Sequence, residues 1–179
     1  MKKPLETGTK APEFSLPGVD GREHSLAAYA RMPVLVVAFT CNHCPYVQAY
    51  EQRLIQFQND FRQQGVQLIC INSNDELNYP EDSFDRMKER AKQKAFNFPY
   101  LRDKDQTVAE AYGAQCTPHV FVFDKGRILR YNGRIDDNWK NSSQAKKQEL
   151  RDAVREILAG KEVSVQFSPP IGCSIKWSQ

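Results

Sequence analysis

The sequence predicts an α/β fold in which a central mixed β-sheet is flanked by helices and preceded by an N-terminal β-hairpin. Apolar, β-branched runs at residues 34–40 and 66–71 alternate with amphipathic helical patterns. The run at 66–71 is apolar almost throughout, as expected for a strand that is covered on both faces. With 179 residues and 40% hydrophobic content, the chain suits one domain, residues 1–179, that buries roughly 70% of its unfolded surface.

The first element is a short β-hairpin within residues 9–25. Phe14 and Leu16 alternate with polar residues, and Pro-Gly and Asp-Gly pairs follow as turn signals. Ser25 is a suitable N-cap for a brief helix over residues 26–30. We expect this hairpin to cover one end of the core and to carry no chemistry.

The strand at 34–40 runs directly into two cysteines, and an amphipathic helical pattern follows at once. Proline is best tolerated at the first helical position, so Pro45 places Cys44 near the N-cap and leaves Cys41 as the more accessible sulfur. A helix N-terminus favours an anion and His43 can add positive charge, so we expect a lowered pKa at Cys41. Cys41 is therefore the predicted nucleophile and Cys44 the resolving cysteine.

Two other interpretations of these cysteines stay open at this point. They could be inert core residues, or Cys41, His43 and Cys44 could bind a soft metal in a metal-binding or sensor module. No fourth ligand is evident, and the turn lies at the carboxyl end of a strand, where open α/β sheets bind ligands. We therefore favour redox chemistry, with no metal and no cofactor.

The other predicted elements continue the alternation of helices and strands. In chain order they are a helix up to Gln64 that ends at Gly65, the strand at 66–71, a charged helix from Pro80 to about Ala95, a short extended piece at 98–101, a helix at 106–112, a hairpin of strands 120–123 and 128–131, and a helix at 143–159. Cys70 lies inside the second strand and is interpreted as a small core residue.

Thr117 and Pro118 stand just before the strand at 120–123, where the missing N–H of proline leaves a sheet position unpaired. If this peptide bond is cis, the backbone here can lie alongside Cys41 and Cys44. Its polar groups could then bind an extended substrate.

The order of elements, with the Cys-x-x-Cys turn first and the Thr-Pro pair later, resembles that of the thioredoxin fold superfamily. Within it the chain is most similar to peroxiredoxin-like or redoxin proteins, which are related to the alkyl hydroperoxide reductase and thiol-specific antioxidant family. The resemblance covers nearly the whole chain and implies a thioredoxin-like fold. It depends on the segments APEFSLPGVDGREHSL for the N-terminal hairpin, AFTCNHCPYV for the active-site turn, FPYLRDKDQTVAEAYGA for the segment before a cis-proline, and TPHVFVFD for the Thr-Pro strand.

The resemblance implies a thiol–disulfide oxidoreductase in which Cys41 attacks, Cys44 resolves, and Thr117 and Pro118 hold the substrate. The implied partners are protein or small-molecule thiols and disulfides, together with an unidentified reductant. Cys44-Pro45 also matches the Cys-Pro pair of peroxiredoxins, so a thiol peroxidase acting on hydroperoxides is the alternative. Peroxiredoxins carry a threonine three residues before that cysteine; here the position is Cys41, which favours dithiol exchange.

The chain departs from thioredoxins where those proteins keep a buried acid six residues before the first cysteine. That position is Leu35, so proton transfer has to use another group or water. His43 and His119 are the two candidates, and each could equally be an ordinary polar histidine.

Two further cysteines lie outside the turn. Cys116 is two residues before Pro118, and Cys173 lies in the non-helical segment 168–179, which we expect to pack onto the body of the domain. We hypothesise that Cys116 and Cys173 form a second redox pair. Two unrelated thiols are the simpler alternative.

Charge and cysteine usage restrict the partners and the compartment. The formal charge of +3 is spread along the chain without a basic tract, so neither a nucleic-acid nor a membrane partner is expected. The N-terminus lacks the apolar stretch of a secretory signal, and no apolar run reaches transmembrane length. Five unevenly spaced cysteines do not suggest a disulfide framework, so we expect a cytoplasmic protein.

Overall fold

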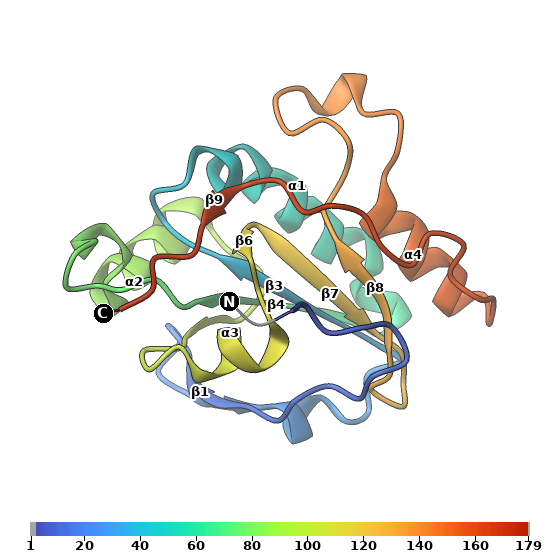
Figure 1. Ribbon diagram of the computed structural model, residues 1–179, viewed down its shortest axis with the longest axis horizontal. Helices are drawn as coiled ribbons and strands as arrows, with labels where there is room; N and C mark the ends of the chain where they lie inside the picture. Colours follow the sequence, from blue (N-terminus) through green and yellow to red (C-terminus); the bar gives the residue numbers. More distant parts are fainter. Residues whose placement is uncertain (1–2, 179) are drawn as a thin grey trace.

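A computed structural model describes residues 3–178 and contains a central sheet of five strands in the order β5-β4-β3-β7-β8 (Figure 1). The strands β3, β4 and β5 are parallel, whereas β7 is antiparallel to both β3 and β8. The predicted mixed sheet and thioredoxin-like fold are confirmed. The strands of this sheet are β3 (Val34–Thr40), β4 (Val66–Asn72), β5 (Tyr100–Arg102), β7 (His119–Phe123) and β8 (Leu129–Gly133).

The other elements surround this sheet. The α-helices are α1 (Pro45–Phe61), α2 (Phe84–Lys94), α3 (Thr107–Tyr112) and α4 (Glu149–Leu158). The short 3-10 helices are η1 (Leu26–Tyr29), η2 (Arg62–Gln64), η3 (Pro80–Asp82) and η4 (Ser142–Gln144). Two small antiparallel sheets pair β1 (Ser15–Pro17) with β2 (Glu23–Ser25), and β6 (Cys116–Thr117) with β9 (Cys173–Ser174).

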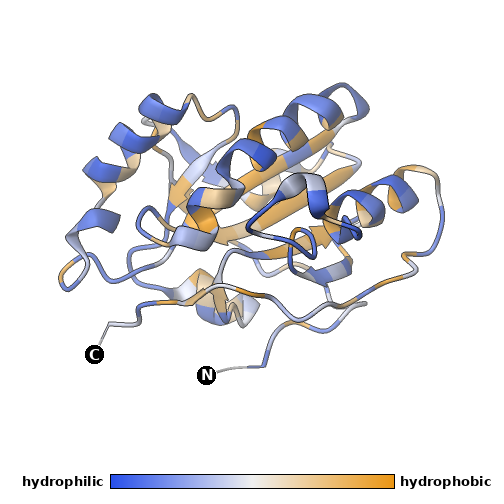
Figure 2. Ribbon diagram, turned by 90° about the horizontal axis from the view of Figure 1, so that it is seen from above, coloured by the Kyte–Doolittle hydropathy of each residue, from blue (hydrophilic) through white to orange (hydrophobic). Residues whose placement is uncertain are grey.

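Strand β3 is central because all seven of its residues are buried. Successive side chains of a strand point to opposite faces, so Val36 joins a core covered by α1, α2 and α4, whereas Val37 joins a core covered by β1, η1 and α3. Figure 2 shows the apolar strands between helices whose outer faces are hydrophilic. The carboxyl end of this rigid strand positions the cysteines.

The N-terminal hairpin and the brief helix after it form as predicted. The Ser25 hydroxyl accepts a hydrogen bond from the Ala28 N–H at 3.3 Å, so Ser25 is the N-cap, although the helix is of the 3-10 type. Two helix starts differ from the prediction. Ser83 has extended backbone angles, so α2 begins at Phe84 rather than at Pro80. Helix α4 begins at Glu149 rather than at residue 143, because its apolar periodicity starts only at Leu150.

The C-terminal segment, residues 168–178, returns across the molecule to β6 (Figure 1). Ile175 is buried and Trp177 packs against the core beside α3, as the sequence predicted for this segment. Ile171 is 44% exposed, so packing is not uniform along it. Within residues 3–178, no helix combines the length and the apolar character needed to span a bilayer.

Candidate active site

The turn after β3 has the predicted geometry. Cys44 is the N-cap of α1, with extended backbone angles of φ −73° and ψ 122°, and Pro45 is the first helical residue. Cys41 follows directly on Thr40, the last residue of β3. Both cysteines are free thiols, and they form a small cluster with Val47 that Tyr46 and Cys173 cover.

Both sulfurs are less accessible than the sequence suggested. Cys41 is 2% exposed and Cys44 is fully buried. The sequence predicted Cys41 as the more accessible of the two sulfurs, but neither is open to solvent, and Cys173 of the C-terminal segment packs against them.

Thr117 brings its loop into contact with both cysteines. Its hydroxyl lies 3.3 Å from the Cys41 sulfur, and its carbonyl oxygen lies 3.2 Å from the Cys44 sulfur. The Thr117–Pro118 peptide bond is cis, and these contacts place the loop alongside the turn, as the sequence predicted. Sequence positions more than 70 residues apart thus form one site.

The surroundings of the two thiols shift their pKa values in opposite directions. Interaction with the Cys41 thiol lowers the pKa of Cys44 below its ordinary value, and the Cys173 thiol and the N–H groups of Val47 and Cys173 act in the same direction. The expected lowering at Cys41 is wrong, because its interaction with Cys44, its burial and the negative charge of Asp82 all raise its pKa.

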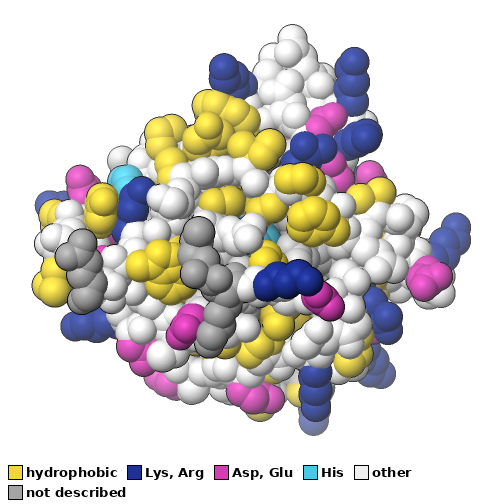
Figure 3. Space-filling view, in the orientation of Figure 1, with side chains coloured by type: hydrophobic (Ala, Val, Ile, Leu, Met, Phe, Trp, Pro, Cys, Tyr) yellow, Lys and Arg dark blue, Asp and Glu magenta, His cyan; other side chains and the backbone are white. Residues whose placement is uncertain are grey.

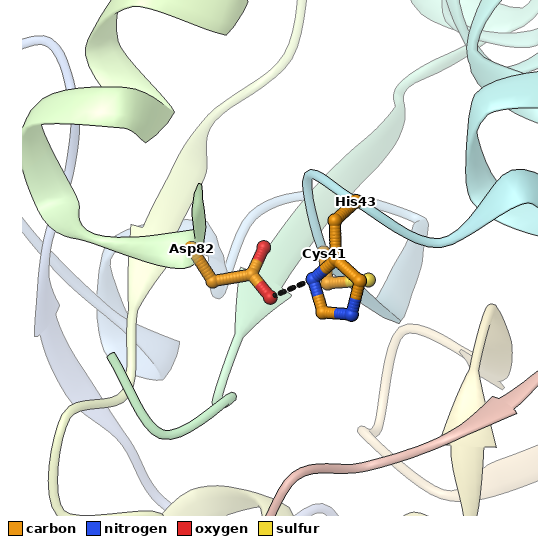
Figure 4. Close-up of side chains that lie close together, drawn as sticks. All are labelled: Cys41, His43 and Asp82. Atoms are coloured by element: carbon orange, nitrogen blue, oxygen red, sulfur yellow. Dashed lines mark hydrogen bonds and ion pairs between the residues drawn. The ribbon is translucent and has the colours of Figure 1, made fainter. Parts of the chain in front are cut away.

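A buried acid that the sequence analysis did not single out lies beside Cys41. Asp82, the last residue of η3, is fully buried and accepts hydrogen bonds from His43 Nδ1 and the Asn42 N–H, both at 2.6 Å (Figure 4). Its oxygens also accept from the side-chain amides of Asn72 and Asn74, at 3.2 Å and 2.7 Å. In the sequence Asp82 is one acid in a charged segment, and nothing in its spacing connects it with Cys41.

His43 is held by this carboxylate. Its ring also stacks on Tyr79, with the centroids 5.5 Å apart, and its side chain is 27% exposed. Because Nδ1 donates to Asp82, the second ring nitrogen is left to accept a proton. Asp82 therefore orients His43 as a proton acceptor near Cys41.

The structure also tests the metal interpretation. In the described part of the chain, one atom each of Cys41, His43 and Asp82 lie within 4.8 Å of one another, so Asp82 replaces Cys44 in the predicted ligand set. Both Asp82 oxygens already accept two hydrogen bonds each, and His43 Nδ1 is one of the donors. A metal ion would have to break that hydrogen bond, which makes the geometry fit proton transfer better than metal binding.

His119 is not available as the proton carrier. It is fully buried in β7, where Nδ1 accepts from the Gln115 N–H at 3.2 Å and Nε2 lies 2.8 Å from the Asn132 side-chain oxygen. Burial lowers the pKa of His119 to about 4. Of the two histidines that the sequence suggested, only His43 lies at the cysteines.

His119 should contribute to acid unfolding. Its pKa is about 4 in the folded protein against about 6.5 when unfolded, so between these values the unfolded state binds more protons. We expect the free energy of unfolding to fall by on the order of 3 kcal/mol as the pH drops through this window. Denaturant unfolding from pH 7 to pH 4 measures it, with His119→Gln as the comparison. Equal pH dependence of the two proteins would contradict the assignment.

The remaining cysteines are placed differently from one another. Cys70 is buried in β4 and its pKa is raised by burial, as expected for a core residue. Cys116 is also buried, its thiol points to the Pro118 carbonyl oxygen at 3.7 Å, and burial raises its pKa to about 12. Cys173 is partly exposed and packs against Cys41 and Cys44.

Comparison with known proteins agrees with this geometry. Residues 7–132 match the AhpC/TSA family. The chain belongs to the AhpC/TSA family. Similar proteins include the thiol–disulfide oxidoreductase ResA of Geobacillus thermodenitrificans, which is 28% identical over 75% of this chain and 69% of its own length. Peroxiredoxin Bcp of Escherichia coli K12 is 27% identical over 62% of this chain and 65% of its own length.

Solved structures of other proteins share the fold of this chain. A hypothetical protein from Sinorhizobium meliloti 1021 is 40% identical, with a TM-score of 0.92 over 98% of this chain and 97% of that one. A thiol:disulfide interchange protein DsbE from Chlorobium tepidum is 19% identical, with a TM-score of 0.70 over 86% of this chain and 99% of that one. This second likeness shows the thioredoxin-like fold alone.

Proposed function

We propose that this protein is an oxidoreductase acting on sulfur groups, in which Cys41 and Cys44 cycle between a dithiol and a disulfide. The observation that carries the proposal is that the two cysteines pack together at the N-terminus of α1, with Thr117 in contact with both. The relatives named ResA and Bcp act on disulfides or peroxides according to their names, which supports the same class.

The reaction begins at Cys41. His43, held by Asp82, takes the Cys41 proton, and the thiolate attacks a substrate disulfide, so that one substrate sulfur leaves as a thiolate. Cys44 then attacks Cys41 in the mixed disulfide and releases the second substrate thiolate. Two electrons pass from the dithiol to the substrate, and the Cys41–Cys44 disulfide remains. The reverse sequence oxidises a substrate dithiol.

The pKa of Cys44 favours the oxidising direction. A thiol of low pKa is a good leaving group, so a substrate thiolate that attacks Cys41 of the disulfide readily expels Cys44. The donors around Cys44 also stabilise the reduced form, which raises the reduction potential. The proposed partners are thus protein or small-molecule thiols and disulfides and a separate redox partner protein. The cytoplasm is the proposed compartment.

A thiol peroxidase is the second candidate, and the charge on Cys44 is the observation that favours it. A Cys44 thiolate could attack a hydroperoxide, forming a sulfenic acid and releasing an alcohol or water. Cys41 would then attack the sulfenic acid, with loss of water, to give the same disulfide.

Two assays on one preparation separate these functions. Disulfide exchange is measured as dithiothreitol-dependent reduction of insulin and as oxidation of a peptide dithiol; peroxidase activity is measured as hydroperoxide consumption. We expect exchange with peptide substrates to be the faster reaction at equal enzyme concentration. Rapid peroxide consumption with no exchange would replace the first proposal by the second. Inactivity in all assays would contradict both.

His43 and Asp82 should control the pH dependence of exchange. His43→Gln is expected to lower the exchange rate at pH 7 by about 10²-fold, because Cys41 loses its proton acceptor, and to recover activity as the pH rises. Asp82→Asn should shift the same pH profile. The matched control is His24→Gln, since His24 also contacts an aspartate, Asp20, at 3.0 Å but lies outside the site. A full rate for His43→Gln at every pH would show that His43 carries no proton.

A further inference from the structure

The C-terminal segment lies along the loop that the sequence analysis assigned to an extended substrate. Strand β9 pairs with β6 in antiparallel register, with Cys173 opposite Thr117 and Ser174 opposite Cys116. Gly172 allows this approach, because a Cβ at this position would lie 2.0 Å from the Thr117 carbonyl oxygen. The edge of the loop is thus occupied by the chain's own backbone, as in β-strand addition of a peptide.

The side chain of Cys173 reaches the redox pair. It packs against the cluster of Cys41, Cys44 and Val47, and its interaction with Cys44 lowers the pKa of Cys44. Cys173 is also the one of these three cysteines that is partly exposed to solvent.

In the register of β6 and β9, Cys173 and Cys116 do not lie opposite each other. Neighbouring residues of a strand point to opposite faces, so Cys116 points away from the face that Thr117 shares with Cys173. The Cys116 thiol instead points to the Pro118 carbonyl oxygen. The geometry therefore favours Cys44, rather than the Cys116 of our sequence hypothesis, as the redox neighbour of Cys173.

We propose that Cys173 is a third redox cysteine, which exchanges with the Cys41–Cys44 disulfide to form a Cys44–Cys173 disulfide and to free Cys41. The Cys173 thiolate attacks the Cys44 sulfur, the bond between Cys41 and Cys44 breaks, and its electron pair leaves on Cys41. Cys173 gives its proton to solvent, and Cys41 takes one through His43. No external oxidant is required, because the step moves a disulfide without changing its oxidation level. This inference rests on the proposed function.

In the reduced protein, the raised pKa of Cys173 disfavours its reactive thiolate form. Burial, followed by the interaction with Cys44, raises the pKa of Cys173 above its ordinary value while Cys44 is reduced. When Cys44 enters a disulfide, its contribution to that rise is lost, so Cys173 ionises more readily after oxidation. The C-terminal segment then acts as an internal substrate: it accepts the disulfide while Cys41 becomes free for an external thiol or disulfide.

Part of the apolar surface at this segment stays exposed. Among the large hydrophobic side chains exposed in residues 3–178, Ile171 belongs to this segment and Phe167 directly precedes it; they are 44% and 56% exposed. Figure 3 shows hydrophobic side chains gathered on the face that the segment crosses. The segment is held at both ends of β9: Ile175 is buried, and hydrogen bonds join Ser168 to Asn132 and Lys176 to Asp75.

Disulfide mapping of Cys41→Ser tests the proposal. The full-length variant is oxidised with diamide, alkylated at acid pH, and digested without reductant for mass spectrometry. We expect a peptide that links Cys44 to Cys173. The matched controls are Cys41→Ser/Cys116→Ser, which should keep this link, and Cys41→Ser/Cys173→Ser, which should lose it. A link from Cys44 to Cys116, or Cys173 fully alkylated after oxidation, would overturn the proposal.

Wild-type protein and Cys173→Ser provide the second measurement. In oxidised wild-type protein carrying one disulfide, we expect part of Cys41 to be alkylatable while Cys44 is not; in Cys173→Ser both should be protected together. Equal protection of Cys41 in the two proteins would overturn the third-cysteine role while leaving the Cys41–Cys44 disulfide intact. If the wild type forms no Cys41–Cys44 disulfide and catalyses no exchange, the proposed function itself is wrong.

Discussion

Cys41→Ser is expected to lower the rate of disulfide exchange by on the order of 10³-fold or more, because the sulfur that bonds to the substrate is removed. The measurement is dithiothreitol-dependent insulin reduction at fixed enzyme concentration. Cys116→Ser is the matched control: it makes the same chemical change at a buried cysteine whose thiol faces a carbonyl oxygen. This control should keep most of the activity.

The result also decides the order of attack. If Cys41→Ser retains most of the exchange rate while Cys44→Ser loses it, then Cys44, whose pKa is the lower of the two, is the attacking sulfur. That outcome would contradict the role of Cys41 and would favour the peroxidase chemistry at Cys44.

Cys44→Ser is expected to accumulate a mixed disulfide between Cys41 and the substrate. A serine hydroxyl cannot displace the bound sulfur, so the first step proceeds and the second stops. Non-reducing electrophoresis and intact mass measure the trapped species, and addition of dithiothreitol should release it. Multiple turnover should fall by on the order of 10³-fold.

A double variant tests whether Cys173 can release the trapped substrate. Cys173 lies beside position 44, so it is the one other described cysteine packed against the pair that could release the substrate. Cys44→Ser/Cys173→Ser should therefore trap at least as much substrate as Cys44→Ser. Normal turnover by either variant would contradict the assignment of Cys44 as the resolving cysteine.

Local sequence signals predicted the parts of the site that depend on neighbouring residues. The apolar run of β3 followed by cysteines and Pro45 was sufficient to predict strand, turn and helix start, because each of these features is encoded within a few residues. The position of Thr117 and Pro118 beside the cysteines was predicted from the order of elements and from family resemblance.

Features that depend on distant packing were missed. Asp82, at the end of η3, lies beside Cys41, and its carboxylate accepts hydrogen bonds from Asn72 and Asn74. No short-range sequence pattern predicts this contact. The burial of both sulfurs and the low pKa of Cys44 depend partly on Cys173, more than a hundred residues away in sequence. Leu35 occupies the position of the thioredoxin acid, so the sequence correctly indicated that β3 carries no acid there. It did not indicate that η3 supplies Asp82 beside Cys41.

The reduction potential of the Cys41–Cys44 pair tests the central claim most directly. The protein is equilibrated in buffers of graded glutathione or dithiothreitol potential, and the disulfide is quantified by alkylation and mass mapping. We expect a reversible two-electron transition at a potential above that of thioredoxin, about −270 mV, because the donors around Cys44 stabilise the reduced form. Two cysteines that stay reduced across the whole range would contradict the redox function, and a potential below that of thioredoxin would contradict the role assigned to the Cys44 thiolate.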